Sequence, residues 1–468
     1  MQKEFDQFAA GNSEAFTGFA DNNDAEFVKW LDEQWQEYEQ FTGKVRDPVP
    51  KPKQAPVVEN VVPGVVQNVV PDAVPRVIQT EEPQLNLLKP LPSATVEQGV
   101  EQVALSDKLH VELQEPHTVE GNLDLFGEVV YLPSKSVQLG PIDTHRSIAK
   151  QWKRLAQSDY QPLLIQIRQH RDEWQLSDWS VLQLVAKQAE HLYSEKSQQS
   201  LYVWFVMTKL GYAVRAGLGD SDLQLLFAGQ QQVYDRDYFE LDGQQYYLLE
   251  PVKTRLSFPR RYPQEVKALD LQYGRSLERS PKTKARMIEV DNAAYQIIAV
   301  EPRQSLLGGY PQLDLRYYFQ APVAEVTGQS LIKALKPKLE GLNLLQQANW
   351  LLRWVQLAFV YKVDGDQFGY ENYLHPEENF HFSANDCEDR SFLYAWLVRN
   401  LINLPVVGVH YPGHVATAIV LPEGAYPALA TSFYHNNQRY WVADPTYIGA
   451  RVGEIMPQYR SIHPEFID

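Results

Sequence analysis

The sequence holds a single cysteine, Cys387, among 468 residues. One thiol excludes an internal disulfide, so this cysteine is either a small buried residue or a reactive group. No run of about 18 apolar residues occurs, and we expect no transmembrane segment. Positive charge is also scarce, since 43 Lys and Arg stand against 59 Asp and Glu. The formal charge of −16 argues against a nucleic-acid partner, because phosphate binding needs clustered cations.

The first residues, MQKEFDQFAAGNSEAF, lack the basic start and the apolar stretch of a secretory signal. Two explanations stay open at this point. The protein is cytoplasmic, or a signal was removed and replaced by an initiating Met.

A chain of this length divides into several globular units. We predict an α+β protein made of six segments: a helical arm (1–47), a Pro/Val-rich linker (48–95), a small β unit (96–143), a helix-and-strand unit (144–260), a second β unit (261–330) and a C-terminal unit (331–468).

The arm carries Phe, Trp and Tyr mostly at spacings of three, four and seven, which predicts a helical stripe. Such an arm packs on its own protein as a helical hairpin or docks a partner, and the sequence leaves both open. The linker alternates Pro with Val pairs and is typical of a semi-extended segment.

Local patterns predict individual elements beyond the linker. We expect strands over 108–114, 123–133, 162–168, 297–309 and 313–322, and helices over 144–157, 175–194 and 342–362.

Cys387 is predicted at the start of a helix. In NDCEDRSFLYAWL, Asn385 or Asp386 caps the helix, and Glu388 and Asp389 occupy its first turn. Unpaired backbone N–H groups and the helix dipole favour a thiolate there, and the thiolate is the nucleophilic form of cysteine.

Two later strands supply partners for this sulfur. His414 opens one strand after a Pro-Gly turn, and Asp444 closes another before Pro445. An imidazole that takes the thiol proton and a carboxylate that orients the imidazole complete a nucleophilic triad. His410 flanks the same turn and is an alternative base. A zinc pair of His410 and His414 is disfavoured, because no third and fourth ligand has suitable spacing.

The segments DCEDRS, YPGHVATAIV and YWVADPTYIG resemble, in the same order, the Cys, His and Asp motifs of the transglutaminase-like superfamily. The acidic DCED form is similar to bacterial transglutaminase-like cysteine proteases, a branch that includes calcium-dependent periplasmic proteases that release surface adhesins. The resemblance covers residues 340–455. It implies a papain-like fold there, with Cys387, His414 and Asp444 catalysing acyl transfer through a thioester.

Three carboxylates beside the sulfur oppose a thiolate and need compensation. Arg390 is one candidate, and Ca²⁺ is another, because it binds carboxylate oxygens. The resemblance implies calcium bound by acids that flank the nucleophile, with Asp386 and Glu388 as possible ligands. No cofactor is otherwise required.

The segment after the predicted helices resembles the catalytic segment and indicates an internal repeat. Residues 200–218 align with 391–409, 223–229 with 415–421, and 246–251 with 440–445. We place Cys387 opposite Glu195, His414 opposite Asp222 and Asp444 opposite Glu250. We therefore predict that 144–260 is a degenerate, non-catalytic copy.

Three functions remain. A protease or amidase acting on a protein or peptide is favoured, because water is always available to resolve a thioester. A transglutaminase-type transfer to an amine is the alternative. A third possibility is a cell-envelope scaffold with a vestigial triad, which binds an envelope partner through its arm. The resemblance favours the periplasm or cell envelope over the cytoplasm.

Overall fold

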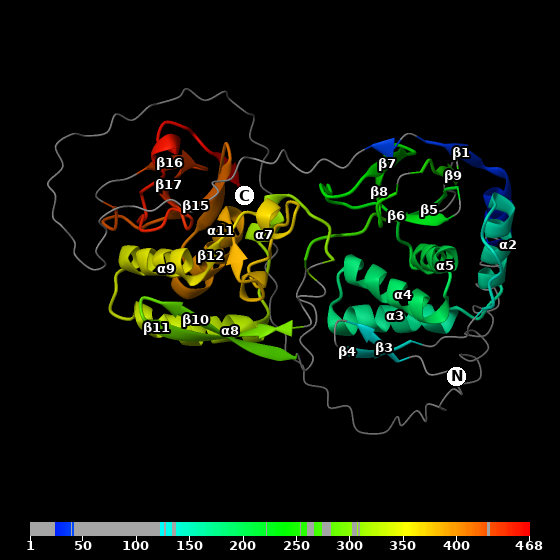
Figure 1. Ribbon diagram of the computed structural model, residues 1–468, viewed down its shortest axis with the longest axis horizontal. Helices are drawn as coiled ribbons and strands as arrows, with labels where there is room; N and C mark the ends of the chain where they lie inside the picture. The colour runs from blue at the N-terminus through cyan, green and yellow to red at the C-terminus, as the bar shows by residue number, and fades with distance from the viewer. Residues whose placement is uncertain are drawn as a thin grey trace, which may run out of the picture. The chain divides into compact units, whose positions relative to one another are not determined.

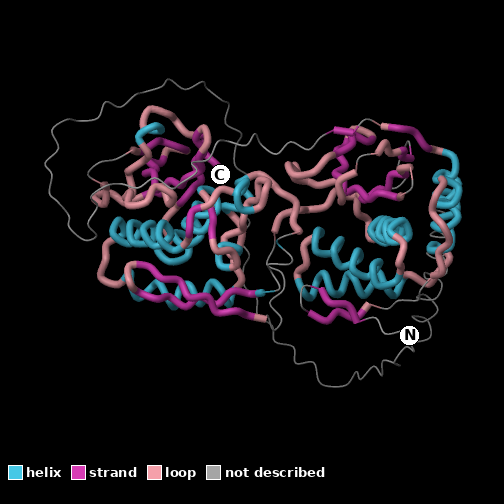
Figure 2. The backbone as a smooth tube through the Cα atoms, in the orientation of Figure 1, coloured by secondary structure: helices cyan, strands magenta, loops and turns pink. Residues whose placement is uncertain are grey.

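The computed structural model describes residues 24–38, 40–41, 122–125, 128–132, 137–220, 222–252, 254–259, 266–273, 282–301, 307, 309–427 and 431–468. These residues form a mixed α+β structure, as predicted (Figure 1). Each of two groups along the chain contains helices followed by a run of antiparallel strands (Figure 2). The predicted linker, 48–95, lies outside the described residues. Within the described parts, no helix has the length and apolar character needed to cross a membrane.

The first group of elements is a curled sheet covered by helices. The helices are α2 (His145–Ala156), α3 (Gln161–Trp174), α4 (Asp178–Leu192) and α5 (Lys196–Lys209). The strands that follow are β5 (Val214–Leu218), β6 (Leu223–Phe227), β7 (Tyr238–Leu241), β8 (Gln244–Leu248) and β9 (Ser257–Pro259). Helix α5 packs on β5 and β6, and α4 packs on α5 (Figure 1).

The strand predicted over 162–168 is wrong, because these residues belong to α3. Leu163, Leu164 and Ile167 are the buried residues of this helix, at spacings of three and four. Pro162 stands in the first turn, where a helix tolerates its missing N–H. A short apolar run does not by itself distinguish a strand from a buried helix.

Two strands from the N-terminal arm complete the first sheet. They are β1 (Trp35–Glu37) and β2 (Gln40–Phe41), and the strand order is β1-β9-β5-β6-β8-β7-β2. Residues 38 and 39 alone separate β1 from β2, yet the two strands stand at opposite edges. Extended chain spans about 3.5 Å per residue, so the sheet curls until its edges nearly meet. The arm closes the sheet.

The predicted helical arm is therefore correct only in part. Residues 24–33 are helical, and Phe27 and Leu31 are buried. The Phe27 ring packs against Trp152 and Trp204. Beyond residue 33 the sheet edges offer backbone partners, and extended structure replaces the predicted helix. Residues 24–41 pack on their own protein, while 1–23 lie outside the described residues.

The predicted small β units are partly present. Strands β3 (Asn122–Leu125) and β4 (Glu128–Tyr131) form a hairpin, and the strand predicted over 108–114 lies outside the described residues. Strands β10 (Thr283–Val290) and β11 (Ala293–Val300) form a longer hairpin.

The strand predicted over 313–322 is wrong, because α7 (Leu315–Phe319) occupies it. The Asp314 side chain accepts a hydrogen bond from the backbone N–H of Arg316 and caps this helix. Helix α8 (Glu325–Leu335) follows and packs on β11, and the 3₁₀ turn η1 (Lys336–Leu339) extends it.

The C-terminal group surrounds a second sheet. Its helical elements are α9 (Leu344–Ala358), α10 (Asp364–Gln367), η2 (Glu378–Phe380), α11 (Cys387–Leu397), the π-turn η3 (Val398–Ile402) and η4 (Pro457–Tyr459). Its strands are β12 (Val360–Tyr361), β13 (Ala384–Asn385), β14 (Val406–Tyr411), β15 (His414–Val420), β16 (Ser432–His435), β17 (Gln438–Ala443) and β18 (Glu465–Ile467).

The order of the second sheet is β16-β17-β15-β14-β18. Helix α11 packs on β14 and β15, and α9 lies between α11 and the β10–β11 hairpin (Figure 1). All eleven residues of α11 are buried. The helix that begins at Cys387 is thus the central element of this group.

The two sheets share a strand order. In each, a buried helix is followed by two hairpins. If their four strands are numbered along the chain, they lie in the sheet in the order 1-2-4-3, and a further strand lies beside the first. The second hairpin turns at Asp242–Gly243 in the first sheet and at Asn436–Asn437 in the other, and all four residues have positive φ. These are two-residue turns of the kind that suits the twist of a hairpin.

The shared turns set the register of the two sheets. When they are superimposed, the pair Ala418–Val442 corresponds to Leu226–Leu248. His414 then falls on Asp222, and Asp444 on Glu250, as in the register from sequence. The predicted match of Cys387 with Glu195 is wrong by one residue: the alignment of 200–218 with 391–409 places Cys387 on Lys196, and these two residues begin α11 and α5.

Candidate functional site

Cys387 is the first residue of α11 and is 1% exposed. Asp386 is the N-cap residue, with extended backbone, and its N–H donates to Asp389 Oδ2 at 3.3 Å. The sulfur donates to Glu388 Oε2 at 3.0 Å. The thiol therefore lies where backbone N–H groups favour a negative charge, with a carboxylate directly beside it.

His414 and Asp444 form a buried pair. His414 begins β15 and Asp444 follows β17, and the distance from Nε2 to Oδ2 is 2.9 Å. Both side chains have no exposed surface. The other oxygen of Asp444 accepts hydrogen bonds from the N–H groups of Thr446, at 2.9 Å, and Tyr447, at 3.2 Å. The carboxylate is thus fixed from two sides.

Nδ1 of His414 is buried and has no hydrogen-bond partner among the described residues. With Nε2 held by Asp444, Nδ1 is the nitrogen left for chemistry. A buried ring nitrogen without a partner is costly in a purely structural histidine.

Two contacts place the Cys387 end of α11 beside His414. The Ser391 hydroxyl, one turn along the helix, lies 2.7 Å from the carbonyl oxygen of Cys387 and 3.2 Å from that of Val415. The Tyr459 ring stacks on His414, and its pKa is raised mainly by burial, lowered by a hydrogen bond with Gln458, and raised further by the charges of Cys387 and Asp444. The helix that begins at Cys387 therefore packs on the strand that begins at His414, and His414 in turn binds Asp444.

His410, the alternative base, has a different neighbour. Its ring is partly exposed, and Nδ1 lies 3.5 Å from Glu465 in β18. Among the described residues, the side-chain clusters that could hold a metal ion contain only Asp and Glu. They do not support the zinc pair of His410 and His414.

Gln356 of α9 organises the loop that follows Asp444. Its side-chain N–H groups donate to three carbonyl oxygens, those of Asp444, Tyr447 and Ala450, at 2.8 to 3.1 Å. Its side-chain oxygen accepts from the N–H of Gly449 at 3.0 Å. One buried amide therefore satisfies four backbone groups and determines where Asp444 lies.

Arg390 is the buried cation of the site. Its guanidinium donates to Asn385 Oδ1 and to the carbonyl oxygen of Phe359, each at 2.8 Å. Burial lowers its pKa to about 10, while Tyr361, Asp386 and other nearby acidic groups oppose that shift. Arg390 is therefore charged at neutral pH and partly compensates the surrounding carboxylates.

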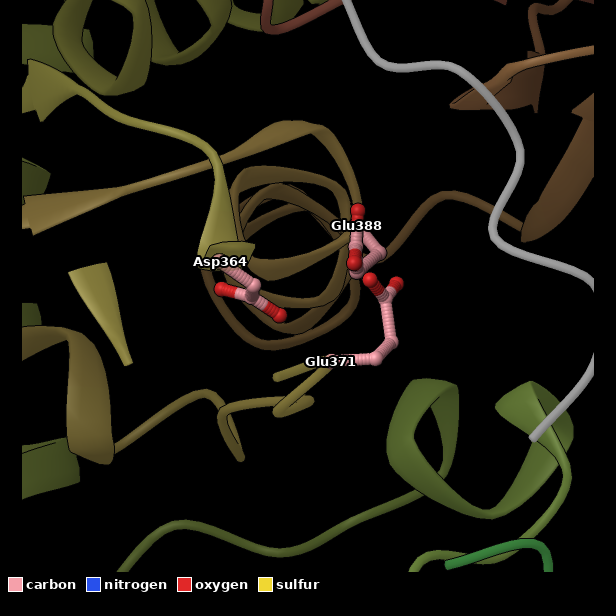
Figure 3. Close-up of side chains that lie close together, drawn as sticks. All are labelled: Asp364, Glu371 and Glu388. Carbon is pink, nitrogen blue, oxygen red and sulfur yellow. The ribbon is translucent and has the colours of Figure 1, made fainter. Parts of the chain in front are cut away.

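Five carboxylates gather around the start of α11 in two overlapping clusters. One is Asp364, Glu371 and Glu388, whose side chains lie close together (Figure 3). The other is Asp364, Asp386 and Asp389. In each cluster, ligand oxygens lie within 4.8 Å of one another. Two oxygens that bind one Ca²⁺ at about 2.3–2.6 Å are at most about 5 Å apart, so these spacings suit that ion.

The two predicted calcium ligands do not share a cluster. Asp386 belongs to one and Glu388 to the other, and Asp364 joins them. Several of these oxygens also hold backbone N–H groups. Asn372 N donates to Asp364 at 2.7 Å, and Leu374 N donates to Asp389 at 2.9 Å. The carboxylates thus also fix the loop over 364–374.

Sequence reasoning missed Asp364 and Glu371 as members of this site. Both lie in DGDQFGYE, about twenty residues before Cys387. Aspartates at the first and third positions and a glycine at the sixth resemble the first half of a calcium-binding loop, which was the available signal. Gly369 indeed has a positive φ of 81°.

Comparison of the chain with models of protein families, with curated proteins and with solved structures finds no match in any of the three.

Proposed function

We propose that residues 331–468 form a transglutaminase-like cysteine protease or amidase with Cys387, His414 and Asp444 as its triad. One observation carries the proposal: the buried His414 has Nε2 bound to Asp444 and Nδ1 without a partner among the described residues, and its strand packs against the helix that begins at Cys387. The motif resemblance described above supports the same assignment.

The residues suggest the following steps. Nδ1 of His414 takes the proton of Cys387, and the sulfur attacks the carbonyl carbon of a peptide bond. The protonated His414 then gives its proton to the leaving amine, and a thioester remains on the sulfur. Water, deprotonated by His414, attacks the thioester and releases the acid and the thiol. Asp444 keeps the imidazole oriented and stabilises its charged form throughout.

The two alternative functions, acyl transfer to an amine and a non-catalytic scaffold, have less support. Transfer of the acyl group to an amine would require a second substrate groove shielded from water, and nothing described here favours one. The scaffold hypothesis relied on the N-terminal arm as a free docking element, but residues 27 and 31 of that arm are buried in their own protein.

The resemblance also suggests a calcium ion and a location in the periplasm or cell envelope, with a protein or peptide substrate. Asp364, Glu371, Asp386, Glu388 and Asp389 are hard oxygen donors suited to Ca²⁺. When bound, the ion would offset the negative charge beside the sulfur. Glu388, which contacts both the thiol and the cluster, links the two.

Alkylation of the single cysteine tests the proposal. Iodoacetamide should label Cys387 well below pH 8 in the wild-type protein and at least about tenfold more slowly in His414→Ala, because the thiolate then lacks its base. His410→Ala is the matched control, since His410 lies on the same hairpin and bonds elsewhere. Equal alkylation profiles in wild type and His414→Ala would refute the triad.

The calcium part is tested separately. Chelation should slow alkylation, and Asp364→Asn should reproduce that loss in the presence of calcium. Glu423→Gln is the control, because Glu423 is an exposed carboxylate that belongs to neither cluster. Isothermal titration that detects no calcium binding to wild type would remove the ion from the proposal and leave the triad intact.

A further inference from the structure

The ring of Tyr459 covers one face of the His414 imidazole. The two rings are parallel within 8°, with centroids 5.3 Å apart. Tyr459 belongs to η4, close to the C-terminal strand, and is 8% exposed. Its ring also packs against Tyr411, the strand partner of His414, at 5.1 Å. Asp444 thus fixes the edge of the imidazole, and Tyr459 fixes its face.

We infer that Tyr459 is a positioning residue, which holds the His414 ring and stabilises its protonated form through the face of the phenol. The inference rests on the proposed function, since a protonated His414 is part of that reaction. The electron-rich face of an aromatic ring attracts a cation within about 6 Å of its centroid. A proton on His414 makes the stacked imidazole such a cation.

The groups around His414 leave this role open to Tyr459. Asp444 reaches it from the end of β17, and Cys387 stands at the start of α11. Tyr411 lies beside it in β14 and is buried, with its pKa raised by burial and by Asp444. Asp444 supplies the strongest attraction, but it acts in the plane of the imidazole. Among these groups, Tyr459 is the one that stacks on the face of the His414 ring.

The test removes the ring and keeps its bulk. Tyr459→Leu and Tyr459→Met should lower the alkylation rate of Cys387 at pH 6 about fivefold, which corresponds to a modest cation–π attraction. Tyr459→Phe should stay within about twofold of wild type, because the phenyl face remains. Tyr440→Leu is the matched control, since Tyr440 is 7% exposed in the same core cluster and makes edge-to-face contacts with His435 and Phe466 instead.

A second readout separates this inference from the proposed function. In a Cys387→Ala background, NMR of ¹³C-labelled histidines follows the titration of His414, with His414→Gln used for assignment. Loss of the Tyr459 ring should lower the titration midpoint by about half a pH unit or more. An unchanged midpoint in both ring-less variants would overturn the role of Tyr459. Failure of His414→Ala to slow alkylation would overturn the triad whatever the NMR result.

Discussion

The sheet of β5 to β9 and the sheet of β14 to β18 have the same strand order, but they carry different side chains at equivalent positions. Cys387 and Asp444 in the second sheet correspond to Lys196 and Glu250 in the first. Lys196 and Glu250 form an ion pair at 3.2 Å with side chains 67% and 64% exposed. The corresponding groups of the second sheet are buried.

The difference teaches that the shared scaffold does not by itself create a site. An exposed ion pair contributes about 0–1 kcal/mol and tolerates replacement. A buried polar group costs free energy unless each of its atoms finds a partner, as Asp444 does through His414, Thr446 and Tyr447. The site positions of the second sheet therefore carry a cost of polar burial that the exposed Lys196 and Glu250 avoid.

The sharpest test of this comparison neutralises the two equivalent carboxylates. Asp444→Asn should slow alkylation at pH 6 and peptide hydrolysis by about 100-fold or more, because an amide no longer orients His414 for proton transfer. Glu250→Gln should change neither rate by more than about twofold, because that pair is exposed. Comparable losses in both variants would mean that the first sheet takes part in the chemistry.

A second test compares two buried glutamines. Gln356→Leu should destabilise the protein by about 3 kcal/mol, because four backbone groups lose their partners. In the first half, Gln188 is 1% exposed and accepts one bond, from the hydroxyl of Tyr202 at 2.9 Å.

Because Nε2 of Gln188 has no partner among the described residues, Gln188→Leu should cost about 1 kcal/mol or less. Urea unfolding of the two variants measures the difference. Equal costs would show that the glutamine of the site does no more than fill space.

The smallest effect is expected at the surface. Arg353 donates two hydrogen bonds of 2.7 Å to Asp291 and holds the pKa of that carboxyl below its usual value. The stabilisation is present above the unfolded pKa of about 3.9 and is lost as pH falls through the folded value.

Arg353→Met should therefore cost about 0.5 kcal/mol at pH 7, since both side chains are partly exposed, and almost nothing near pH 3. Urea midpoints at the two pH values measure this. A cost that persists at pH 3 would show that the Arg353 stem, rather than its charge, supports the β10–β11 hairpin.

Local features of the site could be predicted from sequence, because they depend on neighbours along the chain. The cap at Asp386, the helix from Cys387 and the strands around His414 and Asp444 all follow from short patterns, and the structure has them. Features set by distant segments could not. Glu371 meets Glu388 only after the loop over 364–374 folds back onto α11.

The errors have the same origin. Trp35 and Phe41 fit a helical period, but they form strands because the edge strands β9 and β7 offer them backbone partners. The run over 315–319 looks like a strand until the cap at Asp314 is counted. Tertiary partners in one case and a capping hydrogen bond in the other override local propensity.

Closure of the first sheet by the arm also has a consequence for synthesis. Trp35 pairs with Pro259 and Gln40 pairs with Phe239, so about 200 residues must be made before either strand finds its neighbour. At about 5–20 residues per second, that interval lasts on the order of 10–40 s. The strands of the second sheet all lie between residues 406 and 467. On the ribosome, the arm therefore reaches its place only after the rest of the first sheet has been made.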